Sequence, residues 1–134
     1  MSRIIYTLRL LVFLFVSSQA TVALAGDLMV TPGSLNFYSV PVGQTQSASV
    51  NVYNFGSEDL PIRINDYCGG DFRIVTWCPW SLRPGQSCSI EAHFRPSREG
   101  YQGCTVNVTS EAGEYESISV SGQGVRSDWI YEPY

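Results

Sequence analysis

The sequence predicts an all-β protein, an antiparallel sandwich of about seven strands held by two disulfides. Apolar residues recur at every second position, as they do in strands with one buried face. Turns that contain Gly or Pro separate these runs at short intervals, and no window of a dozen residues shows helical periodicity. Short strands at this spacing are typical of two packed antiparallel sheets.

Four segments show the clearest alternation, and in each one the intervening positions are mostly polar. The apolar positions are Ala48, Val50 and Val52 in 47–54; Cys88, Ile90, Ala92 and Phe94 in 87–95; Cys104, Val106 and Val108 in 104–109; and Ile118 and Val120 in 117–121. Each segment is therefore expected to be a strand with one face in the core and one in water.

Shorter apolar runs at 28–30, 35–37, 60–64 and 72–75 complete the set of expected strands. Turn residues lie between the runs, at Pro32-Gly33, Gly69-Gly70 and Pro84-Gly85 among others. The shorter runs are expected to add Leu35, Phe37, Ile62, Ile64 and Phe72 to the core.

Residues 1–25 have the pattern of a signal peptide. Arg3 and Arg9 form a positively charged region ahead of a short apolar run at 10–16, and Ala23-Leu24-Ala25 forms a cleavage site. A membrane anchor is the alternative, but the unbroken run is shorter than the roughly 20 residues that a span needs. We therefore expect a secreted or periplasmic protein with no membrane span after cleavage, a domain at 26–125 and a tail at 126–134.

The charge of the chain argues against anionic partners. Lys and Arg together number 8 against 12 Asp and Glu, so the net charge is −4. Loss of Arg3 and Arg9 with the signal would lower the net charge to about −6, because the acidic residues all lie in the remainder. Nucleic acid and anionic lipid surfaces are therefore not expected to bind.

The four cysteines are Cys68, Cys78, Cys88 and Cys104, and all of them lie beyond the signal. An oxidising compartment would pair them. Metal ligation is the competing interpretation, but there is no C-x-x-C and His93 is the only histidine. Two disulfides are expected, and the spacing alone leaves three connectivities open.

The order of apolar and turn residues resembles a known family. The matching positions are Pro32, Leu35, Phe37, Val40, Val42-Gly43, Val50, Val52, Asn54, Gly56, Leu60, Asp71-Phe72, Leu82, Pro84-Gly85, Ser87-Cys88, Ile90, Ala92, Phe94, Pro96, Gly100 and Ser121-Gly122-x-Gly124. Over about residues 28–125 this pattern is similar to the immunoglobulin-like ASH domain of abnormal spindle, spindle-defective and Hydin proteins. The exported bacterial branch of that family is often labelled choice-of-anchor D.

The resemblance implies a seven-stranded immunoglobulin-like sandwich that serves as a structural or interaction module and not as an enzyme. It also implies a disulfide between Cys78 and Cys88, which leaves Cys68 to pair with Cys104. The sequence departs from the family at Tyr38, where a glycine usually follows the phenylalanine. This departure concerns the geometry of a local bulge.

Catalytic patterns are weak in this sequence. His93 is expected on the wet face of a strand between Glu91 and Arg95, without a nucleophile motif. The acidic clusters lie in or beside turns, where such residues are ordinary surface. We expect no enzymatic activity, no cofactor and no metal.

Two aromatic segments are the candidate partner-binding residues. Trp77 and Trp80 flank Cys78 in a connecting segment, and the simpler expectation is that the rings pack, one of them over the disulfide, with Trp80 the more exposed. The alternative is that they present a flat apolar surface to a sugar ring or a protein. The tail carries Trp129, Ile130, Tyr131 and Tyr134 and is expected either to fold back on its own sandwich or to dock on a neighbour.

The function expected from these patterns is non-catalytic binding or structural support in the cell envelope or outside the cell, with a protein as the partner. Two alternatives remain. One is a pilus-like subunit or chaperone that acts by strand addition, and the other is a glycan-binding module that uses Trp77 and Trp80.

Overall fold

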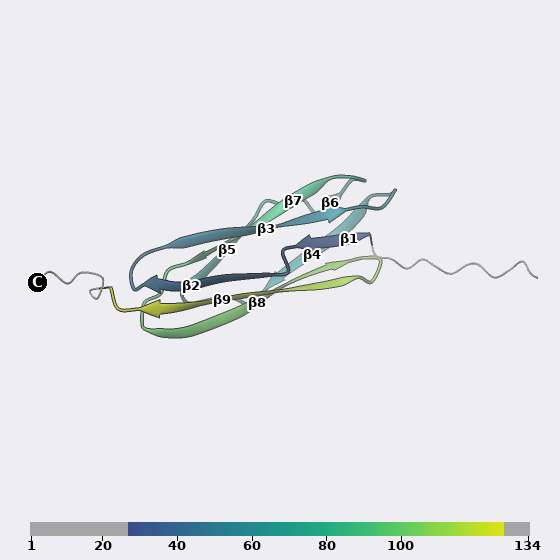
Figure 1. Ribbon diagram of the computed structural model, residues 1–134. Coiled ribbons are helices and arrows are strands. Elements are labelled where there is room, and N and C mark those ends of the chain that lie inside the picture. The colour runs from purple at the N-terminus through teal and green to yellow at the C-terminus, as the bar shows by residue number, and fades with distance from the viewer. Residues whose placement is uncertain (1–26, 128–134) are drawn as a thin grey trace, which may run out of the picture.

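The computed structural model describes residues 27–127, which fold into two packed β-sheets (Figure 1). The expected signal peptide and most of the tail lie outside these residues. Among the described residues, no helix is long and apolar enough to cross a membrane. The strands are β1 (Leu28–Thr31), β2 (Ser34–Pro41), β3 (Gln46–Asn54), β4 (Leu60–Asp66), β5 (Phe72–Thr76), β6 (Ser81–Leu82), β7 (Ser87–Phe94), β8 (Gly100–Ser110) and β9 (Tyr115–Val125).

The predicted sandwich is confirmed, but two details of the prediction are wrong. One sheet has the order β1-β3-β7-β5 and the other the order β2-β9-β8-β4-β6, so the described residues form nine strands and not seven. In addition, β2 runs parallel to β9, whereas every other strand pair is antiparallel. The chain changes sheets at Pro32-Gly33, between β1 and β2, and β6 is too short to show an alternating pattern.

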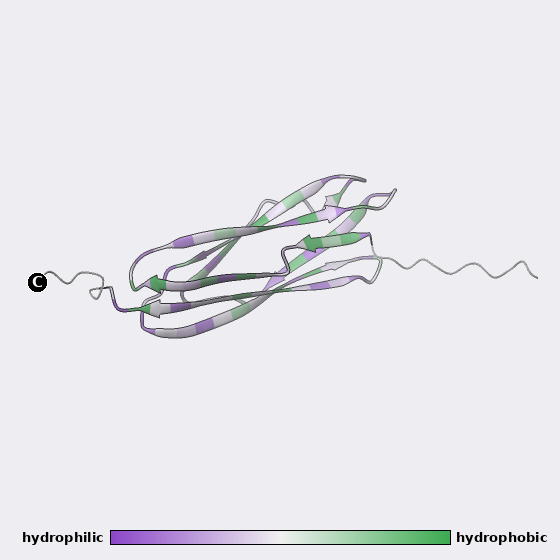
Figure 2. Ribbon diagram, in the orientation of Figure 1, coloured by the Kyte–Doolittle hydropathy of each residue, from purple (hydrophilic) through white to green (hydrophobic). Residues whose placement is uncertain are grey.

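The core lies between the sheets and follows the predicted alternation, which Figure 2 shows as green and paler residues along the strands. Phe94 is fully buried at its centre, with its ring centroid 4.6 Å from that of Phe72 and 5.8 Å from that of Phe37. Gly122 of β9 lies against the same ring, where a Cβ atom would come within 2.5 Å of it. The core residues beyond those expected are Leu28, Val40, Leu60 and Leu82.

Asn54, at the end of β3, is only 1% exposed and satisfies its side chain within the fold. Its Nδ2 donates to the carbonyl oxygens of Glu58, at 2.8 Å, and Leu82, at 2.9 Å. Its Oδ1 accepts from the backbone N–H of Gly56 at 2.8 Å. Buried polar groups are stable only when they are hydrogen-bonded, and these three bonds meet that need. Through the bond to Leu82, the Asn54 side chain also joins the end of one sheet to β6 of the other.

Candidate functional site

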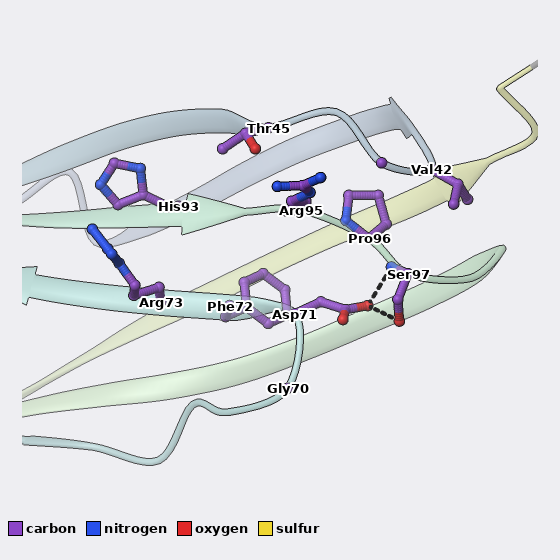
Figure 3. Close-up of a pocket in the computed structure, with 11 residues that line it drawn as sticks. Val42, Thr45, Gly70, Asp71, Phe72, Arg73, His93, Arg95, Pro96 and Ser97 are labelled. Carbon is purple, nitrogen blue, oxygen red and sulfur yellow. Dashed lines mark hydrogen bonds between the residues drawn. The ribbon is translucent and has the colours of Figure 1, made fainter.

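An open pocket of about 730 Å³ lies beside β5 and β7. Arg73, His93 and Arg95 line it, and Arg73 lies opposite His93 in the register of the two strands (Figure 3). His93 Nε2 lies 3.1 Å from Glu91 Oε1, while no side-chain hydrogen bond or ion pair engages Arg73 or Arg95 within residues 27–127. Two guanidinium groups are thus available to carboxylate groups of a partner.

Asp71 anchors one wall of this pocket and is not itself a free acid. Its Oδ2 accepts hydrogen bonds from Gln102 Nε2 at 2.7 Å and from Ser97, whose backbone N lies at 2.8 Å and whose Oγ lies at 3.1 Å. The Ser97 bonds are drawn in Figure 3. The pKa of Asp71 is held below its usual value. The largest cause is the hydrogen bond from Gln102, followed by those from Ser97 and by a smaller attraction to Arg98. The carboxylate thereby fastens the start of β5 to the segment that joins β7 and β8.

Within residues 27–127, β5 is an edge strand, because β7 lies on one side of it and no described strand lies on the other. The carbonyl of Asp71 accepts from the backbone N of Arg95, and the N–H of Trp77 donates to the carbonyl of Ser89, both at 2.9 Å. Backbone groups of successive residues alternate in direction. The N–H and C=O groups of Ile74 and Thr76 therefore point away from β7, toward the free edge.

The disulfide between Cys78 and Cys88 extends the β5–β7 register beyond the end of β5. Alternation places Trp77 on the same outer face as Arg73 and Val75. These three residues form one row along the free edge, which we call the edge strip. It runs from the basic pocket to an indole ring.

Both tryptophans of the connecting segment are exposed, Trp77 by 67% and Trp80 by 79%, so the expectation that their rings pack is wrong. The reason is that the backbone is already held without the rings. Trp77 bonds to β7, the carbonyl of Trp80 accepts from Ile62 N at 2.9 Å, and the Cys78 disulfide fixes the residue between them. Trp80 lies at a separate cavity of about 280 Å³ beside β4.

The second disulfide joins Cys68 to Cys104 and ties the β4–β5 connection to β8. Both pairings are those that the resemblance implied. The tail residues Trp129, Ile130, Tyr131 and Tyr134 lie outside the described residues, so their docking stays a prediction.

The basic pocket and the role of Asp71 were not predicted from the sequence. His93 and Arg95 were expected on an outer face, but no local pattern indicates that β5 pairs with β7 and brings Arg73 beside them. Asp71 belongs to the family pattern, yet its partners lie 26 and 31 residues away. Within residues 27–127, no cluster of three His, Cys, Asp or Glu residues is placed to hold a metal ion.

Solved structures share this fold at low sequence identity. The ASH/PapD-like domain 7 of human CEP192 is 15% identical with a TM-score of 0.67, over 86% of this chain and 99% of that one. The VesB protease of Vibrio cholerae is 17% identical with a TM-score of 0.61, over 72% of this chain and 32% of that one. A protein of unknown function from Porphyromonas gingivalis W83 is 15% identical with a TM-score of 0.60, over 78% of this chain and 49% of that one.

At these identities the structural likeness shows the fold, and the protease activity of VesB belongs to a protein of which this chain spans about a third. No curated protein matches the sequence. The family model described as HYDIN/CFA65/VesB-like, Ig-like domain matches residues 26–123. The chain therefore belongs to the family of HYDIN/CFA65/VesB-like immunoglobulin-like domains, and the resemblance to ASH domains is confirmed.

Proposed function

We propose that this protein is an exported, non-catalytic interaction module of the cell envelope or the extracellular space, and that it binds an extended segment of a protein partner along β5. The observation that carries the proposal is the edge strip, Arg73, Val75 and Trp77, next to backbone groups that no strand of the described fold pairs. Added strands gain affinity from main-chain hydrogen bonds and specificity from alternate side chains.

The charges and rings along the edge define the partner segment. Arg73 and Arg95 favour an acidic residue at one end of the segment, because neither guanidinium has a carboxylate partner within residues 27–127. Trp77 offers an exposed indole to an apolar residue at the other end. The Cys78–Cys88 bridge reduces the entropy that this edge loses on binding, since it holds the Trp77 backbone in place beforehand.

Export is supported by the pattern of residues 1–25 and by the two disulfides, which persist in oxidising compartments. A non-catalytic role is supported by His93, whose described hydrogen-bond partner is Glu91 and not a nucleophile. The pilus-like alternative would use the same free edge and differs in the identity of the partner, a second subunit.

The test uses the outward N–H of Thr76. Thr76→Pro removes this donor and leaves the ladder to β7 intact, because proline is tolerated on the solvent side of an edge strand. Thr76→Val is the matched control, since it loses only the hydroxyl that accepts from Cys78 N. A photo-crosslinking residue placed at Val75 reports binding in the cells that produce the protein. A second one at Ser117, on the other sheet, is the reference position.

We expect a protein adduct from position 75 and none from position 117. Thr76→Pro should remove the adduct and Thr76→Val should keep it, with both variants folded by circular dichroism and with both disulfides intact. Equal adducts from positions 75 and 117, or an adduct that survives Thr76→Pro, would refute strand addition at β5.

A further inference from the structure

A second surface, on the opposite sheet, shows a different chemistry. The strands β2, β8 and β9 contain a single charged residue, Glu116, although charged residues make up 15% of the chain. Their outward positions are instead hydroxyls, amides and tyrosines. In the strand register Asn36 lies beside Ser121, Ser39 beside Gln123, and Gln123 beside Tyr101.

Two of these tyrosines line one hollow. Tyr38 is 72% exposed and Tyr101 is 80% exposed, and both line a cavity of about 350 Å³ together with Asn36, Ser39, Ser121 and Gln123. Gly103, outward on β8 beside Ser121, has no side chain to fill the space between the rows. The hollow therefore has a polar base and two exposed phenol rings.

The backbone at Tyr38 is strained in a way that aims this ring outward. The register between β2 and β9 shifts between Asn36 and Ser39, so that two residues of β2 lie opposite one of β9. Tyr38 has φ of 57°, and it is the one non-glycine residue of 27–127 with a positive φ. Its N–H donates to Asn36 Oδ1 at 2.7 Å, which supports the bend.

A left-handed conformation costs a tyrosine more than a glycine or an asparagine. Bulges commonly reorient a side chain next to a functional site, and strain of this kind persists where the side chain has a use. A folding role for the ring is not apparent, because most of the ring is in solvent. The strained position therefore points to a ligand at the hollow.

We propose that the hollow between Tyr38 and Tyr101 binds a neutral saccharide chain. Hydroxyl and amide side chains both donate and accept hydrogen bonds, which matches the hydroxyl groups of a sugar. The phenol rings supply apolar faces with a polar tip, which suits the C–H faces of a pyranose ring. The lack of charge at the hollow disfavours an anionic glycan, and the lack of an apolar centre differs from the usual core of a protein interface.

The test compares three variants of the full chain by calorimetric titration with cellohexaose, maltohexaose and mannohexaose, and with hexagalacturonate as a charged comparator. Tyr38→Gly removes the ring and relieves the strain, so it should raise or preserve the melting temperature while weakening the binding of a neutral hexasaccharide roughly tenfold or more. Tyr101→Ala should weaken the same binding. Trp80→Ala, at the distant cavity beside β4, is the matched control and should bind as the wild type does.

Each other outcome overturns the proposal. If none of the neutral hexasaccharides binds, or if hexagalacturonate binds more tightly, the saccharide class is wrong. If Trp80→Ala abolishes binding and Tyr38→Gly does not, the site is the tryptophan segment. If the crosslinking residue at position 117, on the same sheet as the hollow, gives a protein adduct that Tyr38→Gly removes while sugar binding is unchanged, the surface recognises protein. The β5 crosslinks measure the proposed function separately, because that strand lies in the other sheet.

Discussion

Replacement of Asn54 by alanine tests whether one buried amide holds the two sheets together at the end that carries the tryptophan segment. Alanine removes three hydrogen bonds, those to the carbonyls of Glu58 and Leu82 and that from the N–H of Gly56. The bond to the Leu82 carbonyl is itself buried, so its loss leaves an acceptor that water does not reach freely.

The expected cost follows from these contacts. A hydrogen bond contributes about 0.5–1.5 kcal/mol net, and a buried group left without a partner costs about 1–3 kcal/mol. With one fully buried and two partly buried bonds lost, we expect Asn54→Ala to lower the free energy of unfolding by about 3 kcal/mol. For a domain of this size this loss corresponds to a fall in Tm of roughly 12–24 °C.

The assay is urea unfolding of three variants followed by tryptophan fluorescence. Asn54→Asp should be less stable than Asn54→Ala at neutral pH, because its carboxylate would face two carbonyl oxygens and supply no donor. Asn51→Ala, on the exposed face of the same strand, should change stability by less than about 0.5 kcal/mol. A loss below 1 kcal/mol for Asn54→Ala, or an Asn54→Asp variant as stable as the wild type, would refute the assignment of Asn54 as a bridge between the sheets.

Three further changes test other contacts of the fold. Removal of the Cys68–Cys104 bridge, which closes a separation of 36 residues, should lower the free energy of unfolding in urea by about 4 kcal/mol. Removal of the Cys78–Cys88 bridge, with a separation of 10 residues, should lower it by about 3 kcal/mol, and the reverse order would contradict the dependence on loop entropy. Because the pKa of Asp71 is lowered in the folded state, its contribution to stability is complete above its usual value of 3.8 and is lost as pH falls through the lower folded value. Asp71→Asn should remove this loss of stability at acid pH. A plot of Tm against pH with the same slope as the wild type would contradict the role assigned to Asp71. Gly122→Ala brings a methyl group within 2.5 Å of the Phe94 ring and should lower the free energy of unfolding by about 1–3 kcal/mol. An unaltered Tm would show that the Phe94 ring moves to make room for the methyl group.

Local patterns in the sequence were enough for most of the strands and most of the core, but not for the two-residue strand β6 and its buried Leu82. Val50, Ile90 and Phe94 alternate with polar neighbours, and burial of one face requires that alternation whatever the partner strand is. The family resemblance implied the disulfide pairs that the structure contains. The parallel pairing of β2 with β9 was not predictable, because period-two alternation carries no information about the direction of a distant neighbour.

The candidate sites depended on tertiary structure for the same reason. Arg73 and His93 are 20 positions apart in the chain and meet only because β5 pairs with β7, and Tyr38 and Tyr101 share a hollow only because β9 lies between β2 and β8. Within the alternating strands, the sequence by itself determined which side chains face water, since that depends on local alternation. The exposure of Trp77 and Trp80, outside those strands, did not follow from it. Only the packed sheets decided which of those side chains become neighbours, since that depends on contacts between residues far apart in the chain.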